Sequence, residues 1–356
     1  MRLFLAAAFA LATTPVLAQA PVTTGEVISA AIEDFIRPGF HELATSAASM
    51  KDGIAALCAT PSEEHLSVGR DGFKAVVLAY SGVEFVHVGP LGSNNRIERM
   101  LFWPDRKGIA LKQVQQALAA EDASATNPKD LAGKSVAMQG LGALEYLLFG
   151  TGAEELAGPD GAYRCSFAAS IAALIGEVTA EMDAEWSDPQ GISAALENPR
   201  PDANDYRTQT EVLEKLAASL VHGTEAIRDQ RVLPILGTSA GQPKPKSALF
   251  WRSGMTVPAL AANFSGLSDF FAKARFPEVM GADNAWIANG AEFEFANAKR
   301  ALAVITSPMD EAVADPKQFK ALEYLVIVTK SLDTLVGEDL SAALGLSVGF
   351  SALDGD

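Results

Sequence analysis

The chain has 356 residues, of which 44 are acidic and 28 are basic, so its formal net charge is −16. The sequence has no cluster of basic side chains to neutralise phosphates, which argues against nucleic acids and anionic membrane surfaces as partners. Metal cations are the more natural partners of such a chain. An acidic surface is also a common means of keeping a protein soluble, so the composition leaves both interpretations open.

The N-terminus has the pattern of a signal peptide. A single basic residue, Arg2, precedes an apolar run, and Val16-Leu17-Ala18 forms a small-residue cleavage pattern. We therefore predict a signal peptide over residues 1–18. No cysteine follows the cleavage point, so a lipoprotein is not expected, and the apolar run is too short for a retained anchor. The mature protein is expected to be periplasmic, with no membrane span.

The chain contains two cysteines, Cys58 and Cys165. In an oxidising compartment we expect them to form a disulfide. Closing a loop of about a hundred residues contributes about 4 to 5 kcal/mol in the chain-entropy model. Two unpaired, buried thiols are the alternative.

Helices are predicted from the start of the mature chain. Apolar residues recur at helical spacing on both sides of Pro38, which indicates one helix kinked there or two short helices. Thr60-Pro61-Ser62-Glu63 has the form of a helix start, with Thr60 as N-cap and Glu63 completing a capping box. This next helix is predicted to reach about His87.

Glu84 and His87 are the first candidate ligands along the chain. Their spacing of three residues puts both on one face of the predicted helix, where they can share a metal ion or a proton. The alternative is that both side chains are simply solvated.

Residues 88–108 are rich in Gly, Pro and Asn and are predicted to form a long ordered loop. Long loops inside compact domains tend to be functional. The loop brings a cation, Arg96, an aromatic ring, Trp103, and a carboxylate, Asp105, close in sequence. These side chains either line a binding site or cap the ends of the bundle.

The remainder of the chain is also predicted to be helical, and strand signals are scarce. A second long loop, residues 237–254, contains Phe250, Trp251 and Arg252 and repeats the combination of aromatic and basic side chains. The fold class is therefore all-α, built from helical bundles. Helices are predicted near residues 108–120, 135–149, 161–186, 205–231, 257–274, 285–302 and 316–335.

Two domains are expected from the length of the mature chain. The concentration of Gly, Pro, Asn and Asp near residue 190 predicts an N-terminal bundle over 19–190, a linker over 191–204 and a C-terminal bundle over 205–356. The pentapeptide Ala143–Leu147 recurs as Ala321–Leu325, which gives weak support for a pseudo-repeat of the two bundles.

The most informative run is Ser135–Gly150, in which a carboxylate, Glu145, lies among apolar residues after two glycines. Each glycine weakens a helix by about 1 kcal/mol relative to alanine, and a buried, unpartnered carboxylate costs several kcal/mol more. One interpretation is that Gly140 and Gly142 permit close packing while Glu145 faces water. The other is that this helix carries a site.

Common catalytic motifs are missing from the sequence. It contains no H-E-x-x-H helix, no G-x-S-x-G elbow, no P-loop and no dinucleotide fingerprint.

Several motifs, in order, resemble those of the imelysin family of exported helical proteins, which includes an insulin-cleaving metallopeptidase and iron-regulated relatives. The resemblance covers nearly the whole mature chain and implies two helical bundles with a cleft between them. The motifs are LCATPS, VGPLG followed by RMLFWPD, QGLGALEYLLFG, YRCSFA, PKSALFWRSG and LSVGFSALDGD.

The family signature is G-x-H-x-x-E, whose histidine and glutamate are the expected metal ligands. The matching hexapeptide here runs from Gly140 to Glu145, and Gly142 stands at the position of the histidine. The glutamate is kept, but glycine offers no ligand. A divalent or iron cation then needs other donors beside Glu145, such as Glu84, His87 or Asp105.

The sequence therefore predicts a binding site and assigns no catalytic residue. The expected cleft is lined by Glu145, Gly140, Gly142, Arg96, Trp103, Asp105 and Arg252, and the expected metal ligands are Glu145, Glu84 and His87.

Three functions are compatible with these residues. The first is a non-enzymatic binding or accessory protein of iron or metal uptake, with a metal ion or small ligand and a periplasmic protein as partners. The second is a metallopeptidase of the imelysin type, which needs an open metal site and a general base. The third is a structural or interaction module in which Glu145 pairs with Arg96 or Arg252.

Overall fold

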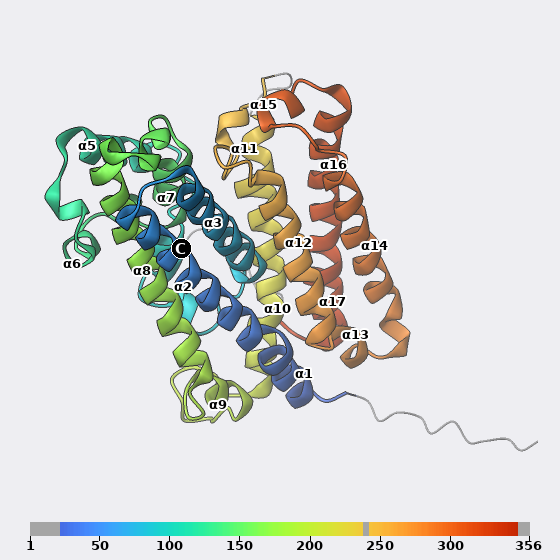
Figure 1. Ribbon diagram of the computed structural model, residues 1–356. Coiled ribbons are helices and arrows are strands. Elements are labelled where there is room, and N and C mark those ends of the chain that lie inside the picture. Colours follow the sequence, from blue (N-terminus) through green and yellow to red (C-terminus); the bar gives the residue numbers. More distant parts are fainter. Residues whose placement is uncertain (1–21, 238–241, 348–356) are drawn as a thin grey trace, which may run out of the picture.

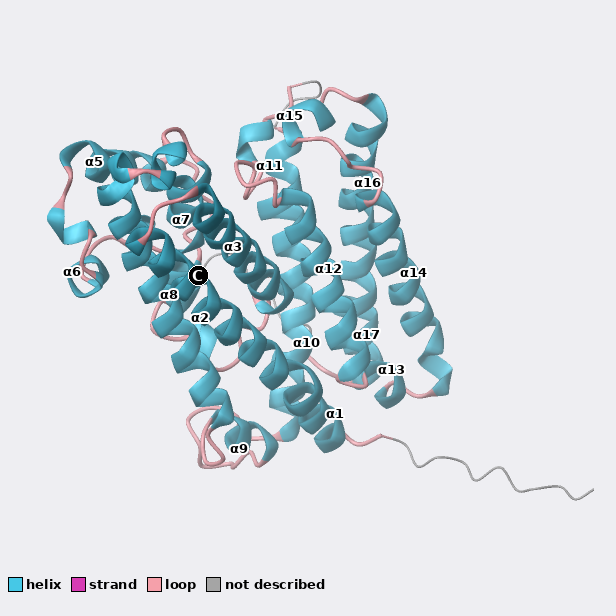
Figure 2. Ribbon diagram, in the orientation of Figure 1, coloured by secondary structure: helices cyan, strands magenta, loops and turns pink. Residues whose placement is uncertain are grey.

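The computed structural model describes residues 22–237 and 242–347. The predicted signal peptide, residues 1–18, lies outside these ranges, as does most of the C-terminal motif LSVGFSALDGD. The described residues form helices, turns and loops and no strand (Figure 2). The predicted all-α fold class is confirmed.

The N-terminal part of the chain is built around three long helices, α2 (Arg37–Ala59), α3 (Glu63–Val83) and α8 (Ala162–Ser187). α2 packs against both α3 and α8, and the shorter α7 (Gly140–Phe149) packs against α8. Smaller helices complete this group: α1 (Thr24–Ala30), α4 (Arg96–Met100), α5 (Ile109–Ala120), α6 (Pro128–Ala132) and α9 (Ile192–Glu197).

The Pro38 region is one continuous helix. A π-helical turn, Ala31–Ile36, joins α1 directly to α2, and Pro38 lies in the first turn of α2. Because the helix is continuous, Pro38 lies inside it, and it follows directly on the wider π-helical turn, where the regular hydrogen-bond ladder is already interrupted. Of the two alternatives left open by the sequence, the single helix is correct.

The start and end of α3 differ from the prediction. Thr60 closes α2, because its N–H donates to the Ala56 carbonyl, and Ser62 caps α3 by accepting a hydrogen bond from the His65 N–H. The helix ends at Val83, and Glu84 follows it as C-cap. His87 therefore lies beyond the helix, and Glu84 and His87 do not share a helix face.

The C-terminal part consists of four long helices and several short ones. The elements are α10 (Gln209–Glu225), a π-helical turn (Ala226–Val232), α11 (Leu233–Leu236), α12 (Thr256–Lys273), α13 (Phe276–Val279), α14 (Ala285–Leu302), α15 (Met309–Ala312), α16 (Pro316–Asp333), a second π-helical turn (Thr334–Asp339) and α17 (Leu340–Leu344). α14 packs against both α12 and α16, and α10 packs against α12 and α16.

The two groups of helices lie side by side (Figure 1). α3 packs against α12, and α1 packs against α10. The buried apolar residues of both groups belong to one continuous cluster. The predicted division at 191–204 stays a prediction, and α9 occupies part of that segment.

The two copies of the repeated pentapeptide lie on α7 and α16. Glu145 of the first copy is buried, whereas Glu323 of the second is exposed. The two copies therefore differ in environment, and the pseudo-repeat stays a prediction.

The two cysteines pair as predicted. Cys58, near the end of α2, and Cys165, in the first turn of α8, form a disulfide with a sequence separation of 107. The bond ties α2 to α8, and α7 packs against α8.

One described helix, Pro159–Ser187, is long and apolar enough to cross a membrane by length and composition. Of its most apolar window, 61% is buried against the rest of the protein. This burial is typical of a helix at the centre of a bundle.

Candidate functional site

The two glycines of α7 have different roles. Gly140 has a φ of +72°, and a Cβ placed there would lie 2.6 Å from the carbonyl oxygens of Arg99 and Met100. Glycine is required at this position, because other residues rarely adopt such a φ. A Cβ at Gly142 would meet no atom within 4 Å. Close packing therefore explains Gly140 and fails to explain Gly142.

Glu145 is buried on α7, with 4% of its surface exposed, so it does not face bulk water. Its Oε1 accepts hydrogen bonds from the backbone N–H of Ser253 at 2.9 Å and from the Ser253 hydroxyl at 2.8 Å. Burial raises the pKa of Glu145, while the bonds from Ser253 and the charge of Arg252 oppose this effect. The carboxylate thus fastens residues 245–254 to α7.

A cavity of about 90 Å³ lies beside this carboxylate, and we call it the Glu145 cavity. Five of the seven predicted cleft residues line it: Glu145, Gly142, Trp103, Asp105 and Arg252. Aromatic and basic side chains complete much of the wall, among them Phe102, Tyr146, Lys246, Phe250 and Trp251. The guanidinium of Arg252 lies 4.6 Å from the centre of the Trp251 ring and 5.4 Å from that of Tyr146, which are cation–π distances.

Two residues of the first loop shape this cavity from the opposite side. Asp105 caps α5, because its two carboxylate oxygens accept the backbone N–H groups of Ile109 and Ala110 at 2.8 and 2.9 Å. Trp103 donates its indole N–H to the Gln230 carbonyl at 2.9 Å, which ties the loop to the C-terminal helices. Both side chains have structural partners as well as cavity surface.

Arg96 lies elsewhere. It binds Glu181 and Glu185 of α8, and these carboxylates raise the pKa of the guanidinium. Arg96 is therefore paired without Glu145. Gly140, the remaining predicted residue, starts α7 and packs on the backbone of α4.

The three predicted metal ligands are not brought together. Glu145 lines the Glu145 cavity, whereas Glu84 and His87 line a different one. Glu84 is already engaged, because it accepts hydrogen bonds from Arg231 and Asn263. Within residues 22–237 and 242–347, no group of three or more His, Cys, Asp and Glu side chains is arranged to hold an ion.

The comparison with protein families identifies this architecture. The family model described as Imelysin, peptidase M75, matches residues 36–335. The chain belongs to the imelysin family. Imelysin membership confirms the resemblance expressed by the sequence motifs.

Two solved structures share the imelysin fold with this chain. An imelysin-like protein from Psychrobacter arcticum 273-4 superimposes with a TM-score of 0.77 at 18% identity, over 94% of this chain and 100% of that one. A structure described as a putative iron-regulated protein A precursor from Parabacteroides distasonis ATCC 8503 gives a TM-score of 0.70 at 14% identity, over 90% and 96%. No curated protein sequence matches the chain.

The family's metal does not fit the donors at α7. Gly142 supplies no ligand where the signature has histidine, and Glu145 Oε1 already accepts two hydrogen bonds from Ser253. A site with one partly committed carboxylate is a poor ligand set for a resident ion. We therefore derive no hydrolytic step through a metal at Glu145.

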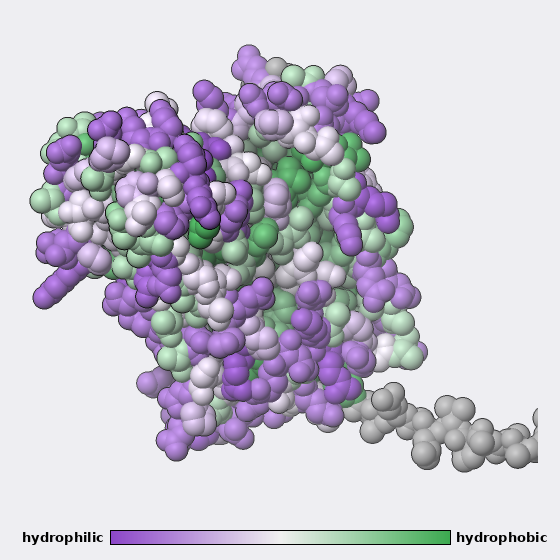
Figure 3. Space-filling view, in the orientation of Figure 1, coloured by the Kyte–Doolittle hydropathy of each residue, from purple (hydrophilic) through white to green (hydrophobic). Residues whose placement is uncertain are grey.

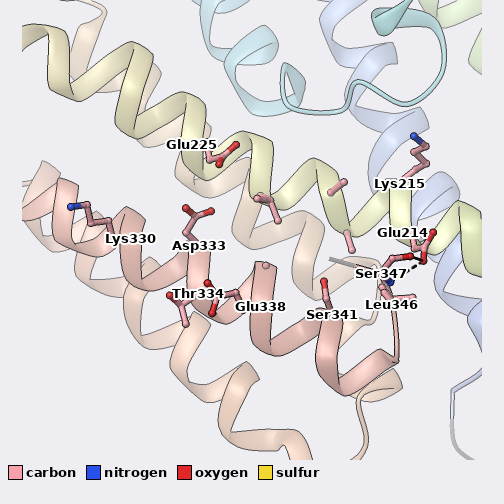
Figure 4. Close-up of a pocket in the computed structure, with 14 residues that line it drawn as sticks. Glu214, Lys215, Glu225, Lys330, Asp333, Thr334, Glu338, Ser341, Leu346 and Ser347 are labelled. Atoms are coloured by element: carbon pink, nitrogen blue, oxygen red, sulfur yellow. Dashed lines mark hydrogen bonds between the residues drawn. The ribbon is translucent and has the colours of Figure 1, made fainter. Parts of the chain in front are cut away.

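Two further grooves lie on the C-terminal helices and contain none of the predicted site residues. One, of about 520 Å³, is lined by charged, small polar and apolar residues of α10, α16 and the segment that follows α16, and Ser347 there donates to Glu214 (Figure 4). The other, of about 650 Å³, runs between α12 and α14 and is largely apolar; Figure 3 shows apolar residues gathered over these helices.

Reasoning from the sequence missed Ser253 as the partner of Glu145, and Arg231 and His222 beside Glu84 and His87. These contacts join residues more than one hundred positions apart, so no local spacing signals them. The one available sign was the position of Ser253 directly after Arg252, which the sequence had singled out.

Proposed function

We propose that this protein is an exported, non-enzymatic binding or accessory protein of iron or metal uptake, and that it uses the Glu145 cavity as its ligand site. Imelysin membership supports the connection with metal. One structure of the same fold is described as a putative iron-regulated protein A precursor. Export to the periplasm is supported by the signal-peptide pattern of residues 1–18 and by the disulfide.

The observation that carries this proposal is the open space at Gly142. A Cβ there meets nothing within 4 Å, and the cavity it opens into is lined by a buried carboxylate, aromatic rings and two basic side chains. Small-ligand sites commonly combine apolar walls with a few polar groups. The volume of about 90 Å³ equals that of about three water molecules in the liquid, which suits a metal ion with a few small bound groups as cargo, the rest of a larger complex lying outside the cavity.

Calorimetric titration of the mature protein tests this site. Ferrous, ferric and zinc ions and a ferric citrate complex are added in turn, and at least one is expected to bind at one site per chain. Glu145→Ala should abolish that binding, while Glu323→Ala, which removes an exposed glutamate in the repeated pentapeptide, should leave it intact. Binding that survives Glu145→Ala contradicts the assignment.

A structural role for Glu145 is the second candidate, and its hydrogen bonds from Ser253 favour it. In that case Glu145→Ala lowers the melting temperature, and none of the four additives changes the stability of the wild-type protein. A bound ligand, in contrast, stabilises the folded state by mass action.

The metallopeptidase alternative is tested in the same preparation. Chelator-sensitive cleavage of a denatured protein substrate, at high protein concentration and free of contaminating protease, would contradict the non-enzymatic proposal. We expect no such cleavage.

A further inference from the structure

A second cavity, of about 170 Å³, lies where the two groups of helices meet, and we call it the junction cavity. Its lining comes from the end of α3 and the segment after it, which includes α4, and from the end of α10, the turn Ala226–Val232 and α12. Trp103 lines both this cavity and the Glu145 cavity. The chain therefore has two neighbouring cavities separated in part by one indole ring.

Arg231 is the main charged group of the junction cavity. Only 8% of its surface is exposed. Its Nη2 donates to both carboxylate oxygens of Glu84, at 2.9 and 2.8 Å. Its Nη1 is buried and has no hydrogen-bond partner among the described residues. An unsatisfied donor on a buried guanidinium is costly. Nη1 itself has almost no exposed surface, so an acceptor in the cavity would bond to it after a small shift of the Arg231 side chain.

The π-helical turn Ala226–Val232 places this arginine. Such turns interrupt an α-helix with extra residues and occur often at functional sites. On the same turn, Arg228 is directed to Asp229 and Asp333, while Arg231 lines the junction cavity. The two arginines of this turn therefore have different partners, and of the two only Arg231 lines the junction cavity.

Two histidines stand at the edge of the junction cavity. The rings of His87 and His222 have centroids 6.3 Å apart, and both rings also line an outer cavity of about 290 Å³. They therefore form part of the wall between the two spaces. Burial lowers the pKa of both histidines, so each is a neutral ring that can donate one N–H at neutral pH.

The carboxylate of the junction cavity does not satisfy all of the cavity's hydrogen-bond donors. The one carboxylate of its lining, Glu84, accepts from Arg231 and Asn263. The donors that remain without a partner among the described residues are Arg231 Nη1 and the ring of His222, because the His87 ring hydrogen-bonds to the Glu84 backbone. A guanidinium fork matches a carboxylate in shape and charge, and the aromatic rings of Tyr80 and Trp103 provide apolar walls.

We propose that the junction cavity binds a small carboxylate, anchored by Arg231, with His87 and His222 at its entrance. The volume of about 170 Å³ equals that of about five or six water molecules in the liquid, which suits an acid of a few carbon atoms. The ligand is a binding partner and undergoes no covalent step. This site goes beyond the proposed function and does not depend on it.

Titration of the mature protein with sodium succinate and sodium acetate, at constant ionic strength set with chloride, tests the site. Calorimetry is expected to show one saturable site per chain, and the tryptophan fluorescence of the protein, to which Trp103 in the cavity wall contributes, should change with it. Arg231→Gln should weaken binding about tenfold or more, because it removes a charge-assisted hydrogen bond. Arg228→Gln, on the same turn but off the cavity, should leave the affinity unchanged.

A second variant keeps the test decisive if Arg231→Gln fails to fold. His222→Gln removes an imidazole at the entrance without breaking the Arg231–Glu84 pair, and it should weaken carboxylate binding several-fold. The absence of saturable binding at millimolar concentrations, or an affinity unchanged in His222→Gln, overturns the proposal. Binding of inorganic phosphate in place of both acids overturns the carboxylate assignment. Glu145→Ala should leave carboxylate binding intact, which separates this result from the test of the Glu145 cavity.

Discussion

The buried Glu145 carboxylate joins two segments 108 residues apart, because both hydrogen bonds it accepts come from Ser253. Its environment favours the neutral form, since burial is the largest influence on its pKa and raises it. A carboxyl with a raised folded-state pKa contributes most to stability below its unfolded pKa of about 4.5, and that contribution is lost as pH rises through the folded value.

Glu145→Gln and Glu145→Ala should therefore behave differently. Glutamine keeps an acceptor for Ser253 and carries no charge, so we expect it to be neutral or stabilising at pH 7, with a smaller advantage at pH 4. Alanine leaves the Ser253 N–H without its partner, while the Ser253 hydroxyl can still donate to the Phe250 carbonyl, and the change should cost about 1 to 3 kcal/mol. Urea unfolding at both pH values measures the difference. A glutamine variant as unstable as the alanine variant would show that the charge itself is needed.

Gly142 gives a second prediction for single residues. It has an ordinary helical conformation, and a Cβ there meets no neighbour. Gly142→Ala should stabilise the protein by about 0.5 to 1 kcal/mol, because alanine favours the helix. Gly142→His should fold and, with Glu145, gain zinc binding measurable by calorimetry. Gly140→Ala is the matched contrast, and it should destabilise because its φ is +72° and its Cβ would contact two carbonyl oxygens. Loss of folding in Gly142→Ala would show that there is no room for a Cβ at this position.

At the scale of elements, the sequence predicted the helices well and their contacts poorly. The helices predicted near residues 285–302 and 316–335 match α14 and the whole of α16, which ends at Asp333, because these helices bury one face and expose the other. The predicted N-cap of α3, Thr60, was wrong, because the Thr60 N–H donates to the Ala56 carbonyl and Thr60 therefore ends α2. Local sequence contains two possible caps there, and only the packing of α2 decides between them.

The candidate site was predicted in part for the same reason. Glu145, Gly142 and Trp103 were found from local composition and family motifs, and the structure brings them to one cavity. Arg96 has the same residue type as Arg252 but faces α8, where Glu181 and Glu185 hold it. Which arginine reaches the cavity depends on how two loops distant in sequence pack, and no periodicity encodes that.

Trp103 links the first loop to the turn Ala226–Val232, and this link is testable. Trp103→Phe keeps an aromatic ring but removes the indole N–H that donates to the Gln230 carbonyl. The loss should cost about 1 kcal/mol in urea unfolding. Trp286→Phe is the matched control, because Trp286 is exposed and its replacement should change stability by less than about 0.5 kcal/mol. Equal effects of the two replacements would contradict the role of the indole bond.

At the scale of the whole molecule, the disulfide is the covalent bond that joins residues far apart in the sequence. It closes a loop between Cys58 and Cys165, 107 positions apart. Reduction, or the double variant Cys58→Ser and Cys165→Ser, should lower the free energy of unfolding by about 4 to 5 kcal/mol in the chain-entropy model. Urea unfolding of oxidised and reduced protein measures this difference. Equal stability of the two forms would show that the bond adds little to helix packing.

The pair of histidines where the two groups of helices meet, His87 and His222, should make the stability of the protein depend on pH. Burial lowers the folded-state pKa of His87 and His222, while Glu84 and Glu98 act on His87 in the opposite sense and Lys215 lowers that of His222 further. As pH falls, the histidines of the unfolded chain bind protons before those of the folded protein do, so stability should fall as pH drops from about 6.5 through the folded-state pKa values.

The variant with both histidines changed to glutamine should lose this part of the pH dependence, measured by melting temperature between pH 8 and pH 5. His41→Gln, which removes an exposed histidine, should retain it. A small carboxylate bound in the junction cavity should offset the loss at low pH in the wild-type protein, because a protonated pair attracts an anion. Destabilisation by acid that is unchanged in the double variant would show that other groups control it.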